Sequence, residues 1–142
     1  MKIATYNVEW MVKLFERGKP SLRRKAAVSR TPGLGSEPKD PLGTAKRIAG
    51  VIKQMAPDIL GVCEGPPMRE QMQAFVHELL DDAYDVWSMP DGLQSVHVLT
   101  SRRLPKGLVI TQLPREDRVF ERCGEGLDSC QRDPGGGRVR PG

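Results

Sequence analysis

The 142-residue sequence has little of what usually indicates a protein's class or compartment. Aromatic residues make up only 5% of it, so a hydrophobic core must be built mainly from aliphatic side chains. No apolar run approaches the roughly 20 residues that a transmembrane helix requires, and the N-terminus has no signal-peptide core. The three cysteines, Cys63, Cys123 and Cys130, form neither a dense disulfide framework nor a zinc motif. These absences favour a single-domain cytoplasmic protein.

Glycine-rich phosphate-binding motifs are also missing. Gly43-Thr44 lacks both the preceding glycine spacing and the Lys-Ser or Lys-Thr pair of a P-loop. No Gly-x-Gly-x-x-Gly turn follows the first predicted strand, as a dinucleotide-binding fold would require. What the sequence does carry is a modest basic excess, with a net charge of +4. Such a charge favours anionic partners, whether nucleic acid, phosphorylated metabolites or lipid headgroups.

A short apolar run, Ile59–Cys63, lies between Pro57 and Glu64. This pattern is typical of a strand buried on both faces of a parallel sheet. Glu64 would then stand where the strand ends, and open α/β sheets bind ligands outside the carboxyl ends of their strands. Glu64 is therefore the first candidate site residue, although most glutamates are simply solvated.

Two further elements complete a predicted βαβ unit with that strand. Lys2–Val8 has the composition of a strand. A helix is predicted over 41–55, because Asp40 can cap it and Pro41 suits its first position. Its apolar residues recur at helical spacing: Leu42, Ala45, Ile48, Ala49, Ile52 and Met55.

The same unit brings Asn7 and Glu64 together. Because neighbouring parallel strands end at the same edge of a sheet, both residues should lie side by side there, although they are 57 positions apart. Taken alone, Asn7 would be interpreted as a residue that ends a strand in a turn.

The remaining pattern predicts an α/β fold with a mixed sheet and both helices on one face. His77 and His97 are interpreted as packed or solvated residues, because no partner is spaced to share a metal with them. The elements predicted after Glu64 are a helix over 68–80 and strands over Tyr84–Met89, Ser95–Thr100 and Leu108–Thr111.

Residues 12–39 form a basic segment interrupted by prolines and glycines, with only Glu16 and Glu37 as acidic residues. We expect a flexible loop, which is either a mobile arm that binds phosphates or a solvated insertion. Its candidate substrate-binding residues are Lys13, Arg17, Arg23, Arg24 and Lys25.

The composition changes after Leu113. Residues 121–142 contain six glycines, two prolines and four arginines, and only two aliphatic residues of appreciable size. Such a segment cannot bury enough surface to offset its chain entropy. We therefore expect a folded region over 1–113, followed at 114–142 by a disordered or out-of-frame tail.

Three segments resemble motifs of the endonuclease/exonuclease/phosphatase family: Ile3–Val8, Pro57–Glu64 and Gly92–Pro105. The resemblance covers residue 1 to about Leu113. It implies two α/β halves packed sheet against sheet in a four-layer sandwich. It also implies hydrolysis of a phosphoester with Mg²⁺ or Mn²⁺, with Glu64 as the metal ligand and Asn7 as a catalytic residue that helps to hold metal and phosphate. The carboxylate oxygens of Glu64 and the amide oxygen of Asn7 are the kind of ligand that such hard cations prefer.

The sequence departs from that family in its second half, since it contains neither the Asp-x-Asn pair nor the Asp-His pair that the family uses for hydrolysis. We therefore expect a truncated first half, inactive alone, which lacks a second half-domain as partner for its sheet. The substrate class, whether nucleic acid, lipid or small phosphoester, stays open. The alternative is a basic fragment that binds nucleic acid without cleaving it.

Overall fold

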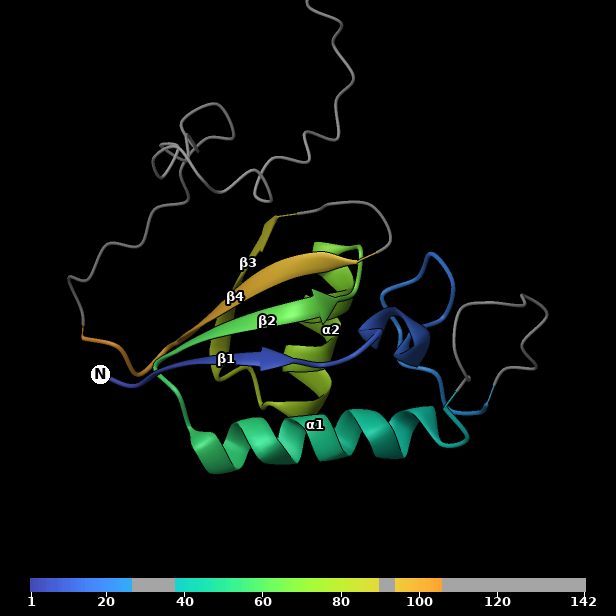
Figure 1. Ribbon diagram of the computed structural model, residues 1–142, viewed down its shortest axis with the longest axis horizontal. Helices are drawn as coiled ribbons and strands as arrows, with labels where there is room; N and C mark the ends of the chain where they lie inside the picture. Colours follow the sequence, from blue (N-terminus) through green and yellow to red (C-terminus); the bar gives the residue numbers. More distant parts are fainter. Residues whose placement is uncertain (27–37, 90–93, 106–142) are drawn as a thin grey trace, which may run out of the picture. The chain divides into compact units, whose positions relative to one another are not determined.

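The computed structural model describes residues 1–26, 38–89 and 94–105, so the strand expected at 108–111 and the segment 114–142 lie outside the described residues. The described part is an α/β fold, a mixed four-stranded sheet with two helices (Figure 1). Its elements are β1 (Ile3–Asn7), the 3₁₀ helix η1 (Met11–Leu14), α1 (Pro41–Met55), β2 (Ile59–Gly65), α2 (Arg69–Leu79), β3 (Tyr84–Met89) and β4 (Ser95–Ser101).

The first helix, α1, begins and ends where its sequence predicts. The Asp40 side chain accepts a 2.8 Å hydrogen bond from the backbone N–H of Gly43, and Pro41 occupies the first helical position. At the other end Ala56 adopts a left-handed conformation, and Pro57 prevents continuation. Within the described ranges, neither helix has the length and apolar character needed to cross a bilayer.

The strands follow the order β1-β2-β4-β3. The two strands that α1 connects, β1 and β2, pair in parallel, with Ile3 opposite Ile59 and Asn7 opposite Cys63. β4 pairs antiparallel with β2 and with β3. The parallel pairing expected from the βαβ pattern is therefore confirmed, and β1 and β3 are the two edges of the described sheet.

The core lies on one face of this sheet, where both helices pack. Leu60 and Val62 of β2 are fully buried there, whereas Ile59, Gly61 and Cys63 between them are only partly covered. The expectation that β2 is buried on both faces is therefore wrong for the described part of the chain. The core comprises these aliphatic side chains together with residues from every other element, among them Val8, Ile48, Ile52, Met72, Phe75, Val86 and Leu99.

The opposite side of the sheet, here the open face, is mostly apolar, and neither described helix covers it, although Thr100 is buried there beside Trp87. Ile3, on the edge strand β1, is 63% exposed, and Val96, on the inner strand β4, is 41% exposed. Between them the register aligns Gly61, Val98 and Trp87 in one row across three strands. The open face consists of Ile3, Thr5, Asn7, Ile59, Gly61, Cys63, Asp85, Trp87, Met89, Val96, Val98 and Thr100.

The first part of the basic segment packs, contrary to the expectation of a loose loop over 12–39. Met11, Leu14 and Phe15 are buried at the spacing of one helical turn, and Leu22 joins them through an isolated bridge to Phe15. The backbone carbonyl of Lys19 also accepts a 3.0 Å hydrogen bond from Gln71 of α2. Buried apolar side chains between the basic residues therefore hold residues 11–22 against the core. Residues 27–37 lie outside the described residues.

Two truncations test which face of the sheet is the core. Leu60→Ala is expected to lower the free energy of unfolding by about 2–5 kcal/mol, because it leaves a cavity in the buried layer. Ile3→Ala, the matched control on the open face, is expected to lower it by less than about 0.5 kcal/mol. Urea denaturation followed by circular dichroism measures both. Equal losses would show that the open face is packed as tightly as the core.

Candidate functional site

Asn7 and Glu64 meet at the carboxyl ends of β1 and β2. The side-chain amide of Asn7 donates a 3.0 Å hydrogen bond to Glu64 Oε1. The contact follows from the parallel register, which sets Asn7 opposite Cys63, the residue before Glu64. The expected juxtaposition of these two residues is thus confirmed, at the sheet edge where α/β folds bind ligands.

A β-bulge directs the Glu64 side chain towards Asn7. In a regular strand Glu64 would share the covered face with Val62, away from Asn7 on the open face. The pairing with β4 instead shifts register between Val62 and Gly65, and Glu64 has a left-handed φ of 57°. Bulges of this kind re-aim a side chain at the end of a ladder, so the site depends on a local departure from strand geometry.

Two more donors complete the surroundings of the carboxylate. The backbone N–H of Trp10 and the side-chain amide of Gln94 each donate a 3.2 Å hydrogen bond to Glu64 Oε2. The hydrogen bond from Asn7, and then those from Trp10 and Gln94, lower the pKa of Glu64 against the opposing effect of desolvation. Because all three donors favour the charged form, Glu64 is a carboxylate at neutral pH.

The turn after β1 fixes the orientation of Asn7. The backbone N–H of Glu9 donates a 2.9 Å hydrogen bond to Asn7 Oδ1, which leaves the amide nitrogen facing Glu64. Glu9 and Trp10 both have left-handed backbone conformations, with φ of 44° and 56°. With Glu64, three non-glycine residues near this site are therefore held in a sparsely populated region, a pattern associated with functional sites.

His97 supports the segment that follows Glu64. It is fully buried, and its Nε2–H donates a 2.8 Å hydrogen bond to the Pro66 carbonyl, while its Nδ1 accepts a 2.7 Å hydrogen bond from the Ser88 hydroxyl. The Pro66 carbonyl requires a proton on Nε2, and burial favours the neutral form of the ring. Gly65 packs directly on that ring, where a β-carbon would clash. His97 is thus a packed residue, as the sequence predicted, and it positions the chain beside the site.

The donor set fits part of the coordination shell of a hard cation. Glu64 supplies an ionised carboxylate, whereas Asn7 turns its amide nitrogen to that carboxylate and keeps one lone pair on the oxygen that accepts from Glu9. Mg²⁺ is often held by only one or two carboxylates together with waters and substrate phosphate. No cluster of three or more His, Cys, Asp or Glu side chains suited to a metal occurs in 1–26, 38–89 and 94–105. These residues can therefore bind such a cation only with further oxygen ligands.

The five basic candidates are not gathered at this site by any described contact except that of Lys13. Its ammonium lies 5.3 Å from the centroid of the Trp10 ring, a cation–π geometry. Arg24 instead pairs with Glu78 of α2 at 3.2 Å. The backbone N–H of Arg23 bonds to the Leu14 carbonyl. Arg17 and Lys25 are exposed.

Two contributors to the site escaped the sequence reasoning, Trp10 and Gln94. Trp10 acts through its backbone N–H, which every residue but proline possesses, so its identity carries no signal. Gln94 follows Glu64 by 30 positions and reaches it only because β4 begins beside the end of β2. The topology alone, once known, would have indicated Gln94.

No family model matches this chain, and no curated protein or solved structure matches it either.

Burial of His97 predicts a pH dependence of stability. Desolvation lowers the pKa of His97, although its hydrogen bond to Pro66 opposes this. Below the ordinary histidine pKa of about 6.5, the unfolded chain binds a proton that the folded chain does not. The free energy of unfolding should therefore fall as the pH drops through that value. The measurement uses a His77→Gln background, because Asp82 raises the pKa of His77 and gives the opposite sign.

An NMR titration of the His97 ring in the same background provides the direct test. The ring is expected to titrate below the ordinary histidine value, in parallel with the loss of stability. A ring that titrates at or above that value would contradict the buried, neutral assignment.

Proposed function

We propose that this chain carries part of the active site of a metal-dependent phosphoester hydrolase of the endonuclease/exonuclease/phosphatase type. The observation that supports the proposal is the contact between Asn7 and Glu64 at the adjoining carboxyl ends of two parallel strands. The three donors around Glu64 keep it ionised, and the strained turn after β1 holds Asn7 in a fixed orientation. Such pre-organisation is what a site for a charged ligand needs.

Each residue has a distinct role in this proposal. Glu64 is a ligand of Mg²⁺ or Mn²⁺, which when bound would neutralise negative charge that develops on the phosphoester. Asn7 orients the Glu64 carboxylate and presents polar atoms to the phosphate. The Trp10 N–H and Gln94 hold the other carboxylate oxygen, so that Glu64 does not turn away when a ligand binds.

The open face supports the finer proposal of a four-layer sandwich. A sheet with an apolar second face favours cover by another layer, and the resembled family covers it with a second α/β half. The Asp-x-Asn and Asp-His pairs absent from this sequence would belong to that half. General acid–base groups contribute roughly a factor of 10²–10⁴ in rate. The chain alone is therefore proposed to be inactive.

The second candidate function is nucleic-acid binding without cleavage. It is favoured by the exposure of Arg17 and Lys25, which make no ion pair with another described residue. Binding of this kind would weaken steeply with salt and persist in a chelator, whereas the proposed site requires a divalent cation.

Metal binding tests the role of Glu64 separately from catalysis. Calorimetric titration with MnCl₂ is expected to show weak binding to the wild-type chain, because one carboxylate is a sparse ligand set. Glu64→Gln should abolish it, since the neutral amide is a poor ligand. Glu70→Gln, on the exposed first turn of α2, is the matched control and should leave it unchanged. Equal binding by all three proteins would remove Glu64 from the proposal.

The state of the open face gives a further test. The chain alone is expected to bind the dye anilinonaphthalene sulfonate and to hydrolyse bis(p-nitrophenyl) phosphate no faster than buffer with MgCl₂. Ile59→Thr should reduce dye binding, whereas Val51→Thr on the exposed side of α1 should not. Hydrolysis that requires Mg²⁺ and is lost in Glu64→Gln would contradict the need for a second half.

A further inference from the structure

The strand β3 forms the edge of the described sheet farthest from the Asn7–Glu64 site. It pairs only with β4 among the described strands, whereas the site lies on β1 and β2. Its first residue, Tyr84, is opposite Ser101 at the end of β4, while Glu64 is close to the beginning of β4. The Tyr84 end of β3 is therefore separated from the proposed phosphoester site by β4 and by most of the length of the strand.

The register determines which backbone groups of β3 face outwards. Ser101 N–H bonds to Asp58 before β2, and Arg102 N–H bonds to Ala83 before β3. Because successive residues of a strand bond to opposite sides, the β4 residues with even numbers bond to β3. Their partners are Asp85, Trp87 and Met89. The N–H and C=O groups of Tyr84 and Val86 therefore point away from the sheet, with no hydrogen-bond partner among the described residues.

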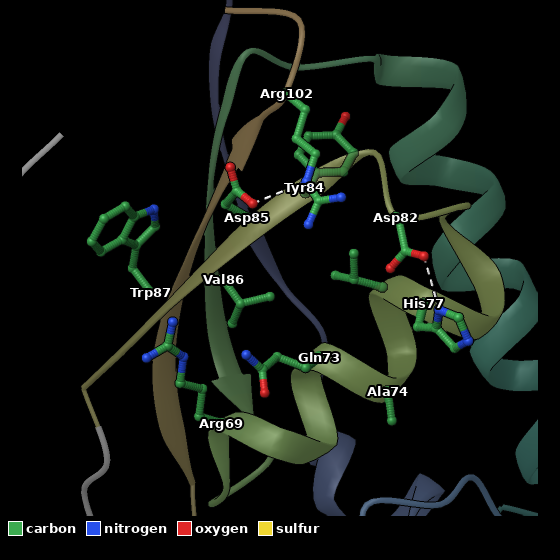
Figure 2. A pocket seen from close by; sticks show the side chains of 11 residues that line it. Arg69, Gln73, Ala74, His77, Asp82, Tyr84, Asp85, Val86, Trp87 and Arg102 are labelled. Carbon is green, nitrogen blue, oxygen red and sulfur yellow. Dashed lines mark hydrogen bonds and ion pairs between the residues drawn. The ribbon is translucent and has the colours of Figure 1, made fainter. Parts of the chain in front are cut away.

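A cavity of about 530 Å³ adjoins this edge, between α2 and β3 (Figure 2). Arg69 and Gln73 extend from α2 towards β3, and Val86 lies between the two elements (Figure 2). Trp87 borders the same cavity from β3, while its indole lies on the open face, where its N–H bonds to Thr100 (Figure 2). We call this cavity, with the outer edge of β3, the β3 groove. The β3 groove therefore combines the outward-facing backbone N–H and C=O groups of β3 with a cavity that side chains of a ligand could enter.

Two side-chain pairs engage charged groups of the β3 groove, and the second is an ion pair only when His77 is protonated. Arg102 pairs with Asp85 at 2.9 Å, and His77 pairs with Asp82 at 2.8 Å (Figure 2). Arg69 is exposed and makes no ion pair or hydrogen bond with any other residue in the described ranges. The groove therefore carries one unmatched positive charge on its α2 side, which favours a ligand with a carboxylate at that place.

We propose that the β3 groove binds an extended acidic peptide segment of a partner protein, which adds to the sheet as a fifth strand. The peptide backbone would bond to Tyr84 and Val86, which present their groups about 7 Å apart, the repeat of a strand. Alternate side chains would enter the cavity, and an acidic one among them would meet Arg69. Strand addition beside a groove for alternate side chains is an established mode of peptide recognition. A compact ligand would leave the backbone groups of this edge unused.

Fluorescence of Trp87 provides the measurement. The chain has two tryptophans, so Trp10→Phe makes Trp87 the only one. The probe is a blocked hexapeptide, Thr-Glu-Val-Glu-Val-Thr, which alternates acidic and apolar side chains. It is expected to change Trp87 fluorescence saturably. A matched peptide with lysine in place of glutamate should bind roughly fivefold more weakly or worse, because it places like charge beside Arg69.

Backbone methylation distinguishes strand addition from simple charge attraction. Two versions of the peptide are N-methylated at alternate residues, one at the odd and one at the even positions. In one of the two versions the methyl groups remove the backbone N–H donors that would face β3. That one should not bind, while the other should bind nearly as well as the parent. Equal binding by both methylated peptides would overturn the proposal, since the backbone would then make no contribution.

Charge reversal tests the role of Arg69 in the same assay. Arg69→Glu should reverse the preference in favour of the lysine peptide, whereas Lys46→Glu, exposed on α1, should leave the preference unchanged. No reversal in Arg69→Glu would exclude the groove as the binding site. Analytical ultracentrifugation tests whether a second copy of the chain occupies β3 instead. A dimer that the peptide does not dissociate would show this, and it would also overturn the proposal.

Discussion

The parallel pairing of β1 with β2 is the constraint on which the rest of the structure depends. Parallel neighbours cannot be joined by a tight turn, so the chain must leave the sheet, cross as α1 and return. That crossing places α1 on one face of the sheet, where it forms the core together with α2. The same pairing places Asn7 beside Glu64, because both strands then end at one edge. Fold and candidate site are thus two consequences of one register.

Two ionisable groups near β2 are held in opposite states by their surroundings. Three hydrogen-bond donors favour the charged form of Glu64, whereas burial favours the neutral form of His97. Both depend on the start of β4, since Gln94 contacts Glu64 and His97 contacts Pro66. Protonation of His97 would therefore disturb the segment that follows Glu64, because the ring holds the Pro66 carbonyl.

The elements could be predicted from sequence because their signals are local. The prediction of α1 followed from the helical spacing of its apolar residues, the Asp40 cap and the flanking prolines. The strands were predicted from short apolar runs. The meeting of Asn7 and Glu64 followed from topology. The packing of residues 11–22 did not, because the basic residues obscured the spacing of Met11, Leu14 and Phe15. The bulge at Glu64 and the backbone donor at Trp10 leave no trace in residue identity.

The contacts around the bulge in β2 also depend on the correct alignment of β4 with β2. A shift of β4 by one residue would turn each side chain of β4 to the other face. It would remove His97 from its place against Gly65 and carry Gln94 away from Glu64 in the same movement. A misaligned sheet would thus lose both the buried, hydrogen-bonded ring of His97 and a hydrogen-bond donor of the Glu64 carboxylate. The candidate site can form only on a correctly aligned sheet, so that an intact site itself reports correct folding.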